Sequence, residues 1–205
     1  MDHARPRRVQ TSKSVFPIGP LRKQTPNVVS KSLLAVDRRC MSWLDQQKPK
    51  SVVYVSFGSL ACMDPKQLVE TAWGLANSGK PFLWVLRPGF VVGSGRAEVP
   101  EGFEEATRGR GLVVESTHSG WNSTLESVCE GVPMLCWSCF GDQRVNSRLV
   151  SSEWVLGLLL EGGLEREGIE RDVKRLMGGG EGEKVREMKG LAEECVRVGG
   201  SSWGQ

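Results

Sequence analysis

Short apolar runs are spaced along the chain, and amphipathic stretches separate them. The clearest runs cover residues 51–57, 81–86, 111–115, 134–137 and 154–160. They are rich in Val, Leu and other apolar residues and show little alternation with polar ones. That pattern is typical of strands buried on both faces of a parallel sheet.

The stretches between these runs carry apolar residues at helical spacing. The helix with the clearest start is expected to begin at Asp64, an N-cap residue followed by Pro65, and to end near Gly79. Other helices are expected over residues 32–44, 101–108, 143–153, 165–177 and 183–198. The expected buried faces are Leu68, Ala72, Leu75 and Ala76 in the helix that begins at Asp64, Val145, Leu149 and Val150 in 143–153, and Ile169, Val173 and Leu176 in 165–177.

Strands and helices that alternate in this way favour an α/β fold. We predict a doubly wound, Rossmann-like parallel sheet with helices on both faces. A chain of 205 residues is long enough to form one such domain with a sizeable core. The predicted division is a disordered stub over 1–14, a linking segment with a short helix over 15–50, and the main domain over 51–203.

Composition and charge are those of an ordinary globular protein. Charged residues make up 25% and hydrophobic residues 39% of the sequence. A net charge of +3 gives no reason to expect a nucleic-acid partner. No apolar run approaches the ~18 residues of a membrane span, and no secretory signal follows Met1, so we expect a cytoplasmic protein without membrane contact. The first 36 residues contain Arg and Ser with Asp2 as their one acid, which leaves a transit peptide as an alternative.

The cysteines predict free thiols in a reducing compartment, because the sequence has six of them and no secretory signal. Cys136 and Cys139 form a C-x-x-C motif after an apolar run, the spacing found in thiol oxidoreductases, so a redox pair is one alternative. A zinc site would need a second such motif or a nearby histidine pair, and the sequence has neither. We therefore expect no metal.

Hydrogen-bonding residues gather in the stretch 117–143. A helix is expected to begin near Ser119, because Ser is a good N-cap residue. The free N–H groups and the positive dipole end of a helix start suit a phosphate, and His118 adds a donor. Glu126 lies one turn after Asn122, and its carboxylate can accept two hydroxyl hydrogen bonds from a ribose diol.

Other polar residues stand where expected strands end. Asp142 and Gln143 lie just past the carboxyl end of the run 134–137. Open α/β sheets bind their ligands at this edge. The run 51–57 is followed by Gly58 and Ser59, a loop that could cradle a phosphate or serve packing alone, since it lacks the G-x-G-x-x-G fingerprint.

The stretch 117–143 contains T-H-S-G-W-N-S, a later Glu, G-V-P and a final D-Q. It resembles the second half of the signature box of plant family 1 UDP-glycosyltransferases. The resemblance extends from about residue 15 to residue 203 and implies the C-terminal, UDP-sugar-binding half of a GT-B fold. By this resemblance the diphosphate would be bound by Ser59, His118, Asn122 and Ser123, the ribose by Glu126, and the transferred sugar by Trp121, Asp142 and Gln143.

The box departs from the family pattern at its start. In the family, the strand that resembles 111–115 runs into W-A-P-Q, and a helix and a further strand precede the T-H pair. Here Ser116 alone joins that strand to Thr117, so the Trp that would stack on uracil, the Gln that would read the base edge and one α–β step are missing near 115–117. We expect 111–115 to lead straight into the His118 loop. The loss should leave a gap in the sheet or move 111–115 into the vacant position.

The resemblance implies transfer of a sugar from UDP-sugar to a hydroxyl of a small-molecule acceptor, without a cofactor. Gln143 favours glucose as that sugar. Family members remove the acceptor proton with a His of their N-terminal domain. This chain has only His3, in a basic stub, and His118, which is assigned to phosphate. The sequence thus predicts no catalytic residue and a truncated transferase with little or no activity alone, which would use an acceptor only if the catalytic domain is supplied.

Two alternatives stay open at this point. The chain could be a non-catalytic module that binds UDP-sugar or a partner protein, and the missing uracil-stacking Trp would weaken nucleotide binding by roughly 1–3 kcal/mol. A dinucleotide oxidoreductase of similar architecture is the other alternative, and the missing glycine fingerprint argues against it.

Overall fold

The structure is a computed structural model that describes residues 39–58, 61–93, 98–115, 121–179, 182–197 and 199. The stub predicted over 1–14 and most of the linking segment over 15–50 lie outside these residues. Ser59 and residues 116–120, which include His118, lie outside them as well.

The described strands run parallel to their neighbours in two separate sheets. The α/β class with parallel strands is confirmed, and the described strands form these two sheets rather than one continuous sheet. The first sheet has the order β1-β2-β3, formed by Val53–Val55, Phe82–Leu86 and Gly111–Glu115. The second sheet pairs β4, Met134–Cys136, with β5, Gly157–Leu159.

The division between the sheets falls where the sequence predicts the loss of an α–β step. β3 pairs with β2 along its whole length, from Gly111 opposite Phe82 to Glu115 opposite Leu86, so β3 has not moved into the vacant position. A doubly wound sheet has the strand order 3-2-1-4-5-6, which places the fourth strand beside the first. Of the two outcomes expected from the loss, the structure shows the gap: among the described residues, nothing pairs with the free edge of β1 or of β4.

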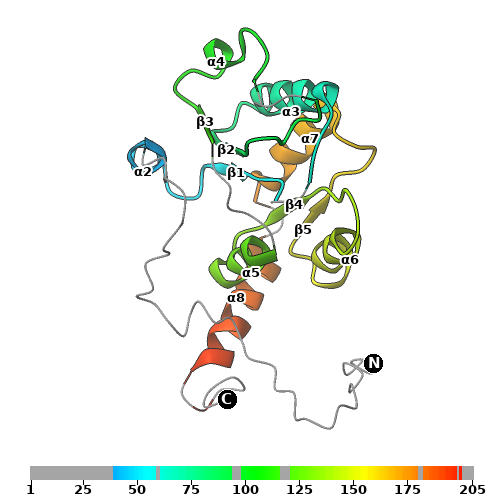
Figure 1. Ribbon diagram of the computed structural model, residues 1–205. Helices are drawn as coiled ribbons and strands as arrows, with labels where there is room; N and C mark the ends of the chain where they lie inside the picture. The colour runs from blue at the N-terminus through cyan, green and yellow to red at the C-terminus, as the bar shows by residue number, and fades with distance from the viewer. Residues whose placement is uncertain are drawn as a thin grey trace.

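Helices cover both faces of the strands. α3, Pro65–Ser78, and α7, Arg166–Leu176, pack together on one face (Figure 1). α5, Trp121–Glu130, and α8, Gly182–Val196, pack together on the other. The shorter helices are α2, Arg39–Leu44, α4, Phe103–Ala106, and α6, Gln143–Arg148, which continues as the π-helix η1, Leu149–Glu153.

Each face has its own apolar core. The larger core lies between α3, α7 and the first sheet, and Trp84 and Phe103 are fully buried in it. The smaller core forms around Val150, Leu156 and Val185, on the side of α5 and α8.

β4 contributes to both cores. Leu135 and Trp137 pack against the larger core, whereas Met134 and Cys136 pack against the smaller one. All four side chains remain half-buried, although the sequence predicts a buried strand here. Among the described residues no strand covers the free edge of β4, which leaves these apolar side chains partly exposed.

α3 begins and ends where the sequence predicts. The carboxylate of Asp64 accepts a hydrogen bond from the backbone N–H of Gln67 at 2.8 Å, and the Gln67 side chain accepts one from the Asp64 N–H at 2.9 Å. This capping box and Pro65 in the first turn fix the start of the helix. Gly79, in the left-handed conformation, ends it, and the predicted face that includes Leu68 is buried.

One predicted helix face is wrong at its first position. Val145 is 61% exposed, whereas Val150 is buried as expected. α6 widens into a π-helix at Leu149, so a single 3.6-residue pattern across 143–153 assigns Val145 to the wrong side. The last predicted strand is shorter than expected and begins only at Gly157.

The two C-terminal helices match their predicted ranges to within a few residues. In α7, Ile169, Val173 and Leu176 are buried as expected. α8 buries Val185 and leaves Leu191 half-exposed. Within the described ranges, neither these helices nor any other combines the length and the apolar composition needed to cross a bilayer.

Candidate functional site

α5 carries part of the predicted phosphate and ribose site. The helix begins at Trp121, and Ser123 and Glu126 lie in its first two turns. Ser123 is half-buried, and its carbonyl accepts a hydrogen bond from the Ser127 hydroxyl at 2.9 Å, whereas Glu126 is exposed. The predicted site residues whose side chains lie outside the described residues are Ser59, His118, Trp121 and Asn122.

The charge of Glu126 acts on Tyr54 of β1. Burial raises the pKa of Tyr54 above its ordinary value, a hydrogen bond with Ser56 lowers it, and the negative charge of Glu126 raises it. Tyr54 points away from the larger core, into which its neighbours Val53 and Val55 pack. The residue predicted to hold ribose is therefore within electrostatic range of this side of β1.

Asp142 and Gln143 lie at the start of α6, past the carboxyl end of β4 as expected. Oε1 of Gln143 accepts a hydrogen bond from the backbone N–H of Cys139 at 3.0 Å, which fixes the side chain against its own loop. Oδ2 of Asp142 accepts one from Nδ2 of Asn146 at 3.3 Å. The amide nitrogen of Gln143 and the second carboxylate oxygen of Asp142 can still serve a polar ligand.

These two groups of residues stand on separate helices. We call Ser123 and Glu126 the α5 group, and Asp142 and Gln143 the α6 group. α5 packs against α8, while α6 continues into η1 beside β4 and β5 (Figure 1). Phe57, after β1, and Trp137, after β4, meet edge to face with ring centroids 5.7 Å apart. This contact brings the carboxyl ends of β1 and β4 together, at the edge where a doubly wound sheet binds its ligands.

The two cysteines of the C-x-x-C motif are free thiols. Burial raises the pKa of the Cys136 thiol to about 11, so this group stays protonated near neutral pH. A redox-active cysteine needs a lowered pKa, which argues against the redox alternative. Across the described ranges, no group of three or more His, Cys, Asp or Glu side chains could hold a metal ion.

Arg87 has a part in this edge that sequence reasoning missed. An Arg just past the end of an expected strand could equally be solvated or contact a ligand. Its guanidinium instead donates a hydrogen bond to the carbonyl of Ala61 and lies 5.7 Å from the ring centroid of Phe90. Arg87 thereby ties the loop after β1 to the end of β2. The sequence showed only that an Arg follows an expected strand. No sequence pattern indicates that its guanidinium donates to a backbone carbonyl.

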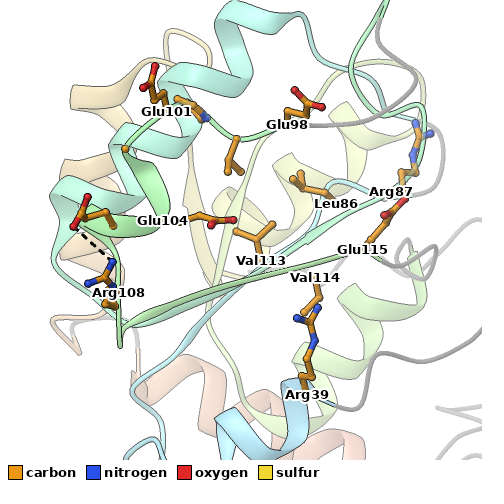
Figure 2. Close-up of a pocket in the computed structure, with 14 residues that line it drawn as sticks. Arg39, Leu86, Arg87, Glu98, Glu101, Glu104, Arg108, Val113, Val114 and Glu115 are labelled. Carbon is orange, nitrogen blue, oxygen red and sulfur yellow. Dashed lines mark ion pairs between the residues drawn. The ribbon is translucent and has the colours of Figure 1, made fainter.

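A cavity of about 910 Å³ opens at the carboxyl ends of β2 and β3 (Figure 2). Leu86 and Val113 give it an apolar part, and Arg39 reaches it from α2. Its charged lining residues are Glu98, Glu101, Glu104, Glu105, Glu115, Arg39, Arg87 and Arg108. None of the predicted site residues described by the structure lines it, so the cavity is separate from the α5 and α6 groups.

The α5 and α6 groups each carry side chains that can hydrogen-bond to a polar ligand. The α5 group has a hydroxyl and a carboxylate, and the α6 group has a carboxylate and a carboxamide. A general base must stand within hydrogen-bond reach of the proton that it removes. In the described part of the chain, no histidine stands at the carboxyl edge to act as one.

Comparison with known proteins gives consistent matches. The model of the family described as UDP-glucoronosyl and UDP-glucosyl transferase matches residues 111–187. UDP-glycosyltransferase 76B1 of Arabidopsis thaliana is 44% identical over 217 residues, which cover 96% of this chain and 48% of that relative. The chain spans about half the length of the curated relatives it matches.

Solved structures agree with these matches. UGT2 of Phytolacca americana, complexed with UDP-2fluoro-glucose and pterostilbene, has a TM-score of 0.71 at 35% identity, over 83% of this chain and 43% of that one. TcCGT1 in complex with UDP has a TM-score of 0.75 at 27% identity, over 92% of this chain and 47% of that one. The predicted fold class, one half of a GT-B fold, is thereby confirmed.

The alignment with the Arabidopsis relative also includes positions that this chain lacks. It runs over 217 positions, which is 12 more than the 205 residues of this chain. That relative therefore has at least 12 residues to which nothing in this chain corresponds. A crossover between parallel strands takes about a dozen residues or more, so the predicted loss of one α–β step is compatible with a difference of this size.

Proposed function

This chain belongs to the UDP-glucoronosyl and UDP-glucosyl transferase family, and we propose that it forms the donor-binding half of an enzyme that transfers a sugar from UDP-sugar to a small-molecule hydroxyl. Glucose is the proposed sugar. Alone, the chain would bind the donor weakly and transfer little or nothing. The acceptor would bind only when the other half of the relatives' length is supplied.

The observation that carries this proposal is the similarity to nucleotide-bound relatives. The two structures named above were solved with UDP-2fluoro-glucose and with UDP, and their similarity covers 83% and 92% of this chain. The proposal places the diphosphate at the start of α5, where Ser123 and the helix N–H groups can donate to it. Glu126 would hold the ribose hydroxyls, and Asp142 with Gln143 would contact the sugar.

The end of β3 supports weak binding of the nucleotide. In the family this strand runs into W-A-P-Q, whose Trp would stack on uracil. Here Glu115 ends the strand and lines a cavity with four further glutamates. Loss of one stacking partner costs roughly 1–3 kcal/mol, which corresponds to a dissociation constant about 5–150 times higher.

A transfer assay tests this proposal. The full chain is incubated with UDP-glucose and a broad panel of phenols and alcohols, and released UDP is measured against a full-length relative. We expect turnover at least about a hundredfold lower than the relative's, because no histidine stands at the carboxyl edge among the described residues and His118 is assigned to the phosphate. Comparable turnover would contradict the proposal, and tight UDP binding without any turnover would favour a non-catalytic binding module instead.

A further inference from the structure

The free edge of β1 presents backbone groups with no partner among the described residues. The N–H of Val53 donates to the carbonyl of Pro81 at 2.8 Å, so Val53 and Val55 direct their backbone groups towards β2. Successive residues of a parallel strand direct these groups to opposite edges. The N–H and C=O of Tyr54 therefore point away from β2, and no hydrogen bond within the described ranges uses them.

β4 has the same feature on one of its edges. The N–H of Met134 donates to the carbonyl of Leu156 at 3.1 Å, and the carbonyl of Cys136 accepts from the N–H of Leu160 at 2.9 Å. Met134 and Cys136 thus bond towards β5. The N–H and C=O of Leu135 point to the opposite edge, where the described residues provide no partner.

These two edges lie on either side of one position in the sheet. The edge-to-face contact of Phe57 with Trp137 joins the carboxyl ends of β1 and β4. Leu135 packs against the same apolar core as Val53 and Val55. In the doubly wound strand order, the position beside the first strand belongs to the fourth, which is the strand that this chain lacks. We call the position between the edges of Tyr54 and Leu135 the β1–β4 slot.

Neither strand has the composition of a sheet edge. Natural edge strands avoid pairing with another chain by being very short or by carrying Lys, Pro, bulges or inward-pointing charges. β1, Val-Tyr-Val, and β4, Met-Leu-Cys, are only three residues long, but they carry no Lys, Pro or charge. Tyr54 is 52% exposed and all of β4 is half-buried, whereas β2, which is paired on both edges, is almost fully buried. The composition is that of central strands, and both are left uncovered along the slot.

We propose that the β1–β4 slot accepts one extended, apolar segment of another polypeptide, which runs parallel to β1 and β4 and hydrogen-bonds to both. The Phe57–Trp137 contact occupies the side of the larger core, so the segment needs small side chains on that side. On the other side Tyr54 is half-exposed, which leaves room for larger apolar side chains. A segment that pairs through only one of its edges would leave the backbone groups of either β1 or β4 without a hydrogen-bonding partner. The partner must therefore insert a strand between β1 and β4 and bond to both.

Amide exchange measured by NMR tests the proposal on the full chain. The probe is a synthetic peptide of about seven residues that alternates Ala with Val between terminal lysines. In the chain alone, the Tyr54 and Leu135 amides should exchange at least about tenfold faster than those of Val53 and Val55, which already bond to β2. With the peptide, Tyr54 and Leu135 should gain protection of about tenfold or more, while Val53 and Val55 change little.

Peptides N-methylated on one edge or the other show whether both strands bind. Each methylated peptide should lose about tenfold in affinity, because each has lost the hydrogen bonds to one strand. If either methylated peptide keeps its affinity, the peptide pairs with a single strand and is not inserted between the two. Protection of Tyr54 and Leu135 in the monomeric chain alone would show that the slot is already filled. Protection that rises with protein concentration would assign it to a second copy, and no saturable peptide binding would reject the slot altogether.

Discussion

Val155 is held in a backbone conformation that its side chain disfavours. Its φ of 54° lies in the left-handed region, where a β-branched residue is strained. The side chain is 41% exposed, so its removal costs little packing. We predict that Val155→Gly raises the free energy of unfolding by about 1 kcal/mol, measured by urea denaturation.

Val145→Gly is the matched control for this change. Val145 is also exposed, at 61%, but it lies in α6, where glycine is unfavourable. The free energy of unfolding should therefore fall by roughly 0.5–1 kcal/mol. If both variants lose stability equally, Val155 is not strained.

Glu70 of α3 and Arg166 of α7 form a bidentate ion pair. Nε of Arg166 lies 2.9 Å from Oε2 of Glu70, and Nη2 lies 2.5 Å from Oε1. The hydrogen bonds from Arg166 lower the pKa of Glu70 from 4.5 to about 2. Because the lowered pKa belongs to the folded state, the pair stabilises the fold fully above a pH of 4.5, and this contribution is lost as the pH falls towards 2.

Glu70→Gln should lower the free energy of unfolding by about 1 kcal/mol at neutral pH, since the pair is partly exposed and screened. The difference from the unchanged protein should shrink between about pH 5 and about pH 3, as measured by urea unfolding. Glu170→Gln, which breaks the exposed ion pair with Lys174, should lower the free energy of unfolding by less than about 0.5 kcal/mol. An effect of Glu70→Gln that does not change with pH would rule out the lowered pKa as its source.

At the scale of residues, positions could be predicted better than contacts. Asp142 and Gln143 emerge after β4 as expected, because a strand followed by a helix fixes where the next residues stand. The bond of Gln143 to the Cys139 N–H and that of Arg87 to the Ala61 carbonyl could not be predicted. Both involve backbone groups that only the folded chain brings near.

At the scale of elements, α3 and α7 approach each other closely at Gly74. A Cβ at this position would lie 2.7 Å from Cβ of Ile169 and 3.0 Å from the carbonyl of Arg166. Gly74→Ala should therefore lower the free energy of unfolding by about 1–3 kcal/mol, because the helices must move apart. Urea or thermal unfolding measures the change.

Gly190→Ala in α8 is the matched control. A Cβ at Gly190 meets no atom within 4 Å, so the gain in helix propensity should stabilise the fold by up to about 1 kcal/mol. Stabilisation by both substitutions would show that α3 and α7 are not closely packed at Gly74.

The pattern of apolar residues predicted the long helices but not how the strands pair. Local spacing and the cap at Asp64 are enough to define α3, because a helix is held by neighbours in sequence. The π-helix η1 breaks that spacing and was missed. Residues 111–115 keep their position in the sheet because they pair with β2. No local sequence pattern indicates which strand they pair with.

At the scale of the molecule, the chain forms about half of what its relatives contain. The alternation of elements predicted the fold class, and the stretch 117–143 predicted the family. Neither could predict how the expected loss of an α–β step would affect the proposed donor site, because that depends on how α5 lies relative to β1. The charge of Glu126 acts on Tyr54, so the proposed site is linked to the arrangement around the β1–β4 slot.

Calorimetric titration of the full chain with UDP-glucose tests the proposed donor site most directly. We predict saturable binding with a dissociation constant about 5–150 times higher than that of a full-length relative. Glu126→Ala should weaken binding by a further tenfold or so, whereas Glu130→Ala, at the other end of α5, should leave it unchanged. The absence of saturable binding, or equal affinity in the Glu126→Ala variant, would contradict the assignment of α5 to the nucleotide.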